Sequence, residues 1–216
     1  MADTAGEPED LLERLKRGDN QAVADFFSLH RERLWQIVRF RLDRRLASRV
    51  DVDDVLQEVY LDATRRLRHY VEDPSVSFFV WLRTIVGQTM IDLHRRHLGA
   101  EMRDANREVS IHGTRYPQAT SVSLVIHLMA DISSPSRVAV RKELTNEVEQ
   151  AIEGMDPIDR EVLALRHFEE LTNSEVSEVL DITQSAASVR YMRAIARLKR
   201  ILAEVPDLFD EGRESK

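Results

Sequence analysis

The stretch from Glu170 to Leu202 constrains this chain most, because it predicts two short helices joined by a turn of three residues. Thr172 is a favoured N-cap residue, and Glu175 follows three residues later, so the two side chains can form a capping box. Asp181 opens the turn, where glycine suits a left-handed backbone best and aspartate is one of the few tolerated substitutes. A second helix then begins at Gln184. This pattern is typical of a helix-turn-helix, whose second helix fits the major groove of DNA.

The second helix of this pair has two different sides. Its apolar side recurs at steps of three and four residues and can dock on a core. It comprises Ala187, Tyr191, Ala194, Leu198 and Ile201. A cationic side recurs at the same steps and comprises Arg190, Arg193, Arg197 and Arg200. Such arginines suit a DNA backbone, but they also suit a solvated outer face, so the pattern alone leaves both alternatives open.

The composition excludes several classes of protein. The chain of 216 residues contains no cysteine, which rules out disulfides and thiolate chemistry and fits a reducing cytoplasm. We expect a cytoplasmic protein without membrane insertion, because no apolar run is long enough for a membrane span or signal peptide. Glycine and proline are scarce, and the alternation typical of strands is nowhere sustained. We therefore predict an all-α protein.

The formal net charge of −7 is unusual for a DNA-binding protein, whose affinity comes largely from phosphate neutralisation. Acidic residues gather in segments 1–10, 51–58, 143–161 and from 204 on, and basic residues in 31–49, 94–96 and 190–200. Local basic stripes can bind DNA, whereas the overall balance predicts a DNA-binding protein that depends on a partner. A further hypothesis is that acidic segments draw the domains of the free protein together over their DNA faces.

The helical periodicity predicts two small domains joined by a flexible linker. The expected organisation is a disordered N-terminus at 1–10, a domain at 11–99, a linker at 100–136, a domain at 137–203 and an acidic tail at 204–216. The linker is polar and longer than an ordinary connection, apart from an apolar patch from Val122 to Met129. In the second domain, Asp156 is the expected cap of a helix with Pro157 at its first position.

Within the first domain, the helix boundaries follow from likely caps and breaks in the pattern. Asn20 is the expected cap of a helix running to about Leu46, and Asp51 is expected to start the next helix. Tyr70 to Ser77 is predicted to be a loop, broken at Asp73-Pro74. An aromatic cluster then opens a helix that extends to about His97.

The helix that starts at Asp51 carries a second face besides its apolar side. Asp54, Gln57, Glu58 and Leu61 recur there at helical steps. Acidic residues in a first turn suit the helix dipole, but that preference does not account for Gln57 and Leu61. A mixed polar and apolar strip of this kind is typical of a protein-binding surface.

A metal site or an enzymatic function has little support in the sequence. His94 and His97 lie one helical turn apart near Asp92, but this spacing matches no common set of metal ligands. Beside Arg95 and Arg96, the two histidines favour a phosphate-contacting surface. No glycine-rich phosphate loop or nucleophile motif is present. We therefore expect no metal, no cofactor and no catalytic residue.

Several motifs in order resemble the sigma factors of bacterial RNA polymerase. Those similar to sigma region two are DVLQEVY at 54–60, FVWL at 79–82 and DLHRR at 92–96. Those similar to region four are MDP at 155–157, REVL at 160–163 and VRYMRA at 189–194. Two such regions without region three are the layout of the extracytoplasmic-function (ECF) group. The resemblance implies a protein that binds core RNA polymerase and directs transcription initiation at promoter DNA.

The resemblance also implies roles for individual residues. Contact with the polymerase, at the clamp helices of its largest subunit, falls to Asp54, Gln57, Glu58 and Leu61. Recognition and opening of the −10 element fall to Tyr70, Ser77, Phe78, Phe79, Trp81, Arg95 and Arg96. Contact with the −35 element falls to Gln184, Ser185, Ser188, Arg190, Arg193 and Arg197. The polymerase flap is a further implied partner, and an anti-sigma factor is common in the family. Strand opening needs aromatic surfaces for unstacked bases, although Trp81 by itself is more typical of a core aromatic.

The alternative hypothesis is a self-sufficient helix-turn-helix repressor or activator, whose N-terminal domain senses a ligand or forms a dimer. The acidic net charge argues against tight DNA binding without a partner. Salt-sensitive binding to a palindromic duplex in the absence of polymerase would support this alternative.

Overall fold

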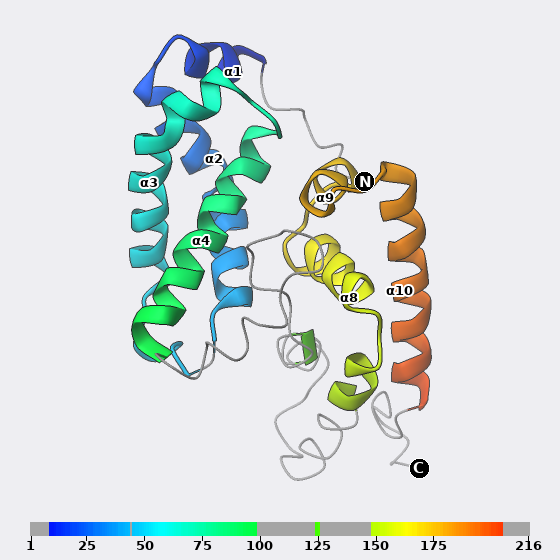
Figure 1. The fold of residues 1–216 in the computed structure, drawn as a ribbon. Coiled ribbons are helices and arrows are strands. Elements are labelled where there is room, and N and C mark those ends of the chain that lie inside the picture. The colour runs from blue at the N-terminus through cyan, green and yellow to red at the C-terminus, as the bar shows by residue number, and fades with distance from the viewer. Residues whose placement is uncertain (1–8, 44, 99–123, 126–147, 205–216) are drawn as a thin grey trace, which may run out of the picture.

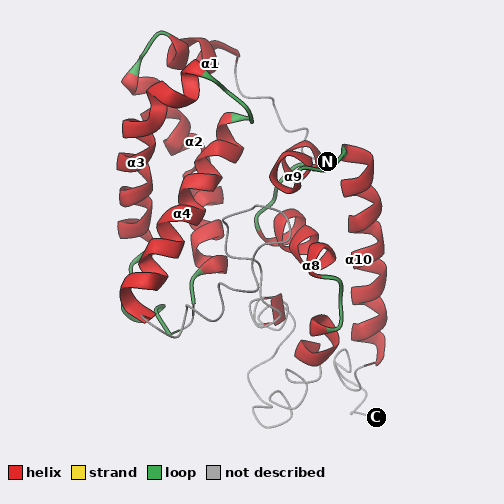
Figure 2. Ribbon diagram, viewed as in Figure 1, coloured by secondary structure: helices red, strands yellow, loops and turns green. Residues whose placement is uncertain are grey.

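The computed structural model describes residues 9–43, 45–98, 124–125 and 148–204. Within these ranges the chain is helical and contains no strand, which confirms the predicted all-α class (Figure 2). The helices gather into two groups that lie side by side, α1 to α4 in one and α8 to α10 in the other (Figure 1). None of the described helices is long and apolar enough to cross a membrane. The expected linker and acidic tail lie almost entirely outside the described residues, as does most of the N-terminus.

The first group consists of four helices around a common core. They are α1 (Glu9–Lys16), α2 (Asn20–Arg41), α3 (Val52–Glu72) and α4 (Phe78–Leu98). Helix α2 packs against both α3 and α4, and α3 and α4 also pack against each other. The fully buried side chains of this core include Phe26, Leu34, Ile37, Val59, Leu82 and Val86. Their burial explains the long helical periodicity of the first domain.

Three expected boundaries in this group need correction. Asp19, not Asn20, caps α2, because its carboxylate accepts a hydrogen bond from the Gln21 amide (2.9 Å). Helix α2 also ends at Arg41, before the expected limit near residue 46, and the Asp43 carboxylate accepts from the Arg45 amide in the turn that follows. Helix α3 continues to Glu72, so Tyr70 belongs to its last turns rather than to a loop. Asp51 caps α3 as expected.

The second group begins with helical residues 148–153 and continues through the helix-turn-helix. Its elements are α8 (Pro157–Leu163), a π-helix η2 (Ala164–Phe168), α9 (Asn173–Leu180) and α10 (Gln184–Glu204). Asp156 caps α8 with Pro157 at the first position, which confirms that prediction. The π-helix was not predicted. In it the Glu169 amide donates to the Ala164 carbonyl oxygen, five residues back, at 3.0 Å.

Local geometry confirms the helix-turn-helix. The Glu175 amide donates to the Thr172 hydroxyl (3.1 Å) and the Thr172 amide donates to the Glu175 carboxylate (2.7 Å), which completes the capping box. Asp181 ends α9 in a left-handed conformation with φ 52° and ψ 48°. The chain therefore uses aspartate where a left-handed residue is needed to turn between the two helices.

Part of the apolar linker patch belongs to the second group. Leu124 and Val125, the two described residues of Val122 to Met129, are fully buried. They belong to the core cluster of Ile152, Leu163 and Leu198. Hydrophobic burial in this core accounts for the apolar character of this part of the patch.

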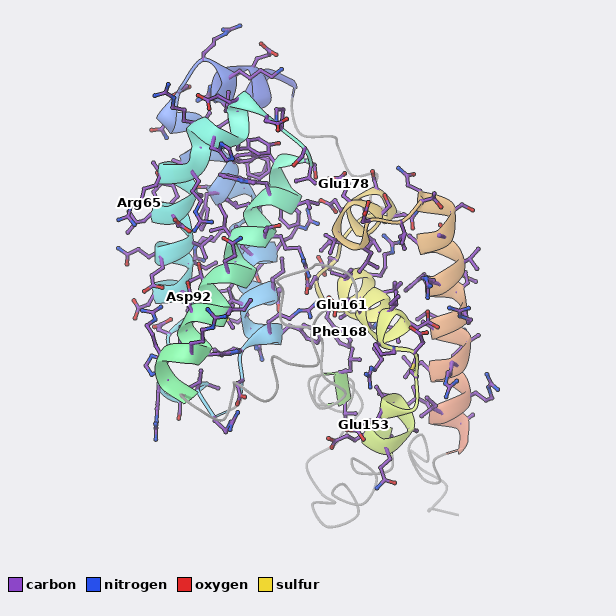
Figure 3. The ribbon with its side chains drawn as sticks, in the orientation of Figure 1. Arg65, Asp92, Glu153, Glu161, Phe168 and Glu178 are labelled. Atoms are coloured by element: carbon purple, nitrogen blue, oxygen red, sulfur yellow. The ribbon has the colours of Figure 1, made fainter. Side chains whose placement is uncertain are left out.

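The two helical groups contact each other directly through aromatic and charged side chains. The Phe40 ring of α2 stacks on the Phe168 ring of η2, with centroids 4.9 Å apart and planes 8° apart. Glu161, Phe168 and Glu178, labelled in Figure 3, come from the second group and lie on its side toward the first. Phe40 is accordingly a member of the second group's core cluster. The two groups therefore form one continuous packed unit in this structure.

Candidate nucleic-acid and protein interfaces

The outer face of α3 presents the four residues expected at a protein interface. Asp54, Gln57, Glu58 and Leu61 are all exposed. Leu61 is one of the few large apolar side chains of the described residues left open to solvent, at 47% exposure. The opposite side of α3 buries Val55, Val59 and other core residues, so the helix cannot turn this face inward. The structure thus places an acidic strip with an apolar member on the surface.

Glu58 of this strip pairs with a residue expected at DNA. The Arg96 guanidinium of α4 donates to the Glu58 carboxylate at 2.9 Å, and both side chains are about half exposed. Arg95 is exposed and lies 3.8 Å from the Asp92 carboxylate. The expected polymerase surface on α3 and the basic end of α4 are therefore adjacent.

The histidine pair near this end has no metal-site geometry. His94 is buried, and its Nε2 accepts a long hydrogen bond from the Asp43 amide (3.4 Å). Burial lowers the pKa of His94, although the Asp43 carboxylate opposes this shift. His97 is exposed. The described residues contain no cluster of three side chains able to hold a metal ion.

Three of the four aromatic residues expected at the −10 element lie in the core. Phe78 and Phe79 are buried, and the buried Tyr70 donates its hydroxyl to the Val76 carbonyl oxygen (2.9 Å). Trp81 is half-buried, and its ring lies 4.8 Å from that of Tyr70. In this arrangement Trp81 alone of the four offers part of its surface to solvent. The Ser77 amide donates to the Glu178 carboxylate of α9 (2.7 Å).

The N-terminal end of α10 is open to solvent. Gln184, Ser185 and Ser188, expected at the −35 element, are all exposed. The Gln184 side-chain amide donates to the Ser174 hydroxyl (3.1 Å), which ties the start of α10 to α9. In Figure 1, α10 is the outermost helix of the second group, on the side away from α1 to α4.

The arginines of α10 are held along one flank of the helix. Asp159 of α8 is almost fully buried and accepts hydrogen bonds from Arg190 (3.1 Å) and Arg193 (2.9 Å). Arg197 donates to the Gly154 carbonyl oxygen at 2.7 Å. Sequence reasoning expected these side chains at DNA, whereas the structure shows that they also anchor α10 to α8.

Two residues of α10 that sequence reasoning did not single out are prominent on its outer face. Val189 is 62% exposed and Met192 is 66% exposed. They lie four and seven residues after Ser185, on the same helical face, and away from the apolar stripe that faces the core. Large apolar side chains outside that stripe were the sequence signal that could have identified them.

Taken together, these features define a two-domain helical DNA-binding protein, with a helix-turn-helix in one domain and an acidic protein-binding face in the other. Family comparisons agree with this class. Residues 26–98 match the model for Sigma-70 region 2, and residues 145–198 match the model for Sigma-70, region 4. The chain belongs to the ECF group of RNA polymerase sigma factors, and it directs promoter recognition in transcription initiation.

Similar proteins match over nearly their whole length. The ECF RNA polymerase sigma factor SigW of Bacillus subtilis is 24% identical, over 90% of this chain and 96% of its own. The RNA polymerase sigma-H factor of Pseudomonas aeruginosa is 27% identical, over 92% of this chain and 95% of its own. A solved structure of CnrH in complex with the cytosolic domain of CnrY has 23% identity and a TM-score of 0.49, covering 89% of this chain and 95% of that chain.

Proposed function

We propose that the α3 face binds the clamp helices of core RNA polymerase, while α10 enters the major groove of the −35 element. The observation that carries this proposal is the exposure of both surfaces on one chain: the strip Asp54, Gln57, Glu58 and Leu61, and the N-terminal end of α10. Exposed carboxylates around an apolar side chain suit a cationic partner, because electrostatic complementarity steers association. The HTH geometry suits the groove.

The −10 element falls to the region between α3 and α4 and to the basic end of α4. Trp81 retains exposed ring surface on which an unstacked base can pack, and Arg95 and Arg96 are exposed cations for the phosphate backbone. The buried rings of Tyr70, Phe78 and Phe79 support this surface from below. The sigma factor carries out no catalytic step itself, and its place beside polymerase and promoter DNA is the cytoplasm.

Charge reversal on α3 tests the polymerase contact. The double variant Asp54→Lys/Glu58→Lys is expected to lose co-elution with core polymerase, because it replaces an acidic strip with cations. Glu32→Lys/Glu72→Lys changes the net charge equally at exposed positions outside the strip and serves as the control. Unchanged co-elution of the first variant would remove this face from the account.

Transcription from a promoter library with the wild-type holoenzyme tests the DNA contacts. New promoter-specific transcripts are expected, with shared sequences at both −10 and −35. Tight binding of the chain alone to a palindromic duplex, without any effect on polymerase, would instead support a self-sufficient regulator.

A further inference from the structure

The outward face of α10 is apolar rather than cationic. Residues at three- and four-residue steps along this face are all open to solvent: Ser185, Ser188, Val189, Met192 and Ala196. Val189 and Met192 are the largest members, and more than half of each is exposed. Burial of these side chains in the core is excluded, because the stripe of Ala187, Ala194 and Leu198 occupies the inner side of the helix.

The cations of α10 flank this face and do not lie on it. Arg190 and Arg193 are held by Asp159, and Arg197 by the Gly154 carbonyl oxygen. Arg193 keeps 57% of its side chain exposed, so it can still reach a phosphate. No acidic residue occurs between Gln184 and Ala203. The surroundings of the apolar face therefore favour a polyanion as its occupant over an apolar protein surface.

The chemistry of the major groove then limits what the face can recognise. Arginine reads guanine through paired hydrogen bonds, but the arginines here are turned to the flank. The apolar feature of the major groove is the C5 methyl group of thymine. Building on the proposed −35 function, we propose that Val189 and Met192 recognise thymine methyl groups, with Ser185 and Ser188 contacting neighbouring base edges and Arg193 a phosphate.

Methyl deletion in the DNA tests this recognition. Holoenzyme formed with the full chain is used to select −35 sequences from a randomised promoter library, and each selected thymine is then replaced singly by uracil, which lacks the methyl group. We expect at least one thymine whose methyl loss weakens promoter binding about fourfold, the effect of one buried methyl group. The Val189→Ala and Met192→Ala variants are expected to bind the thymine and uracil promoters equally.

Leu29→Ala is the matched control, because Leu29 is an equally exposed apolar side chain on α2. It is expected to retain the methyl effect. Equal binding of thymine and uracil promoters by the wild type would overturn the proposal, as would a methyl effect that survives in both alanine variants. Failure of the holoenzyme to select any −35 sequence would contradict the proposed function itself, which keeps the two failures distinct.

A separate observation, at the contact between the two helical groups, carries a second inference. Glu169, fully buried, accepts hydrogen bonds from Arg41 of α2 (2.7 Å) and Arg83 of α4 (2.6 Å). Glu161 of α8 also accepts from Arg41, at 2.6 Å. Both arginines are themselves buried. Charged groups removed from water in this way hold the groups together, because separating one from its partners while it stays buried costs several kcal/mol.

The same contact reaches the segment proposed for the −10 element. Glu175 of α9 accepts from Arg33 (3.0 Å), and Glu178 accepts from the Ser77 amide (2.7 Å). Carboxylates of the helix-turn-helix domain thus occupy donors of the first domain. Figure 3 shows Glu178 between the two groups, where α9 approaches the start of α4.

The spacing of the promoter elements is incompatible with this contact. Elements centred at −10 and −35 lie about 25 base pairs, or about 85 Å, apart on straight B-form DNA. A compact chain of 216 residues is only about 45 Å across. We infer that the structure is a closed form, in which Glu161, Glu169, Glu175 and Glu178 cover the first domain, and that the domains separate when polymerase binds.

Distance measurements in the full chain test this closed form. Since the chain has no cysteine, Arg65→Cys on α3 and Lys199→Cys on α10 accept paired spin labels at exposed positions on opposite sides of the contact. We expect one short, narrow distance distribution in the free protein and an increase of tens of ångströms when core polymerase is added.

Glu169→Gln in the labelled chain separates docking from folding. It is expected to shift the free protein toward long distances, because two buried arginines lose their carboxylate, while the helix content by circular dichroism is unchanged. Glu72→Gln, at an exposed position, is expected to leave the short distance unchanged. A broad, long distribution in the free wild type would overturn the closed form, as would an unchanged distance after polymerase binds.

Discussion

Arg96 lies 2.9 Å from Glu58, so a residue proposed to bind promoter DNA is paired with a residue proposed to bind polymerase. The pair joins the ends of two helices, α4 and α3, across 38 residues of sequence. Because both side chains are about half exposed, their attraction adds little to stability. Its importance lies in the position of two surfaces that act on different partners.

The Arg96→Ala variant distinguishes two roles for this pair. If Arg96 contacts a DNA phosphate, the slope of log affinity against log salt concentration for promoter binding falls by about 1, and binding to core polymerase is retained. The melting temperature is expected to change little. A normal salt slope with weakened polymerase binding would show instead that Arg96 only orients Glu58. Salt titrations of promoter binding and co-elution measure both quantities.

Loss of the Asp159 carboxylate is expected to weaken the attachment of α10 to α8. Asp159→Asn removes the charge that pairs with Arg190 and Arg193, which should reduce the free energy of unfolding by about 1–2 kcal/mol. Asp62→Asn breaks a more exposed pair with Arg66 and is expected to cost under about 0.5 kcal/mol. Urea denaturation measures both variants. Equal effects of the two would contradict the anchoring role of Asp159.

The imidazole of His30 makes the stability depend on pH. Burial and the nearby Arg33 guanidinium lower the pKa of His30 to about 4, although Glu175 opposes them. Between pH 6.5 and about 4 the unfolded chain therefore binds a proton that the folded chain does not, so stability is complete above pH 6.5 and falls as the pH is lowered. Partial exposure limits the loss to about 1–2 kcal/mol.

The variant His30→Phe tests that assignment. Phenylalanine does not titrate, and it can keep the aromatic contacts of His30 with Phe26 and Phe79. The difference in unfolding free energy between pH 7 and pH 5 is expected to be smaller in His30→Phe than in the wild type. An identical difference would assign the pH dependence to other groups.

The left-handed conformation of Asp181 predicts opposite effects for two substitutions. Asp181→Gly is expected to raise the free energy of unfolding by about 0.5 kcal/mol, because glycine adopts positive φ without a steric penalty but loses more chain entropy. Asp181→Val is expected to lower it by about 1–2 kcal/mol, because a β-branched residue suits this conformation poorly. Urea denaturation of both variants gives the order, and a reversed order would contradict the role of the turn.

The parts of the structure that were predictable from sequence depend on residues close to one another in the chain. Thr172 and Glu175 indicated the start of α9, and steps of three and four placed Asp54 and Leu61 on one open face. The pairing of Arg193 with Asp159 could not be found in this way. An arginine on a helix has the same local pattern whether it faces water, DNA or an acid 34 residues away.

The aromatic residues before and within α4 illustrate the same limit. Phe78, Phe79 and Trp81 were grouped because they are neighbours in sequence, but helical geometry points them in different directions. Phe78 and Phe79 fill the core and Trp81 remains at its edge. Sequence gives the composition of such a cluster, whereas packing decides which rings remain available.

The π-helix η2 has a consequence for how this chain tolerates changes in length. Its wide turn accommodates one more residue than an α-helical turn between α8 and the segment that carries Phe168 and Glu169. Deleting a single residue there would restore regular α-helix and rotate everything after it by about 100°. The Glu169 carboxylate would then turn away from Arg41 and Arg83 without any change in composition at the contact. The meeting of the two domains therefore depends on the number of residues in one helical turn as much as on their chemistry.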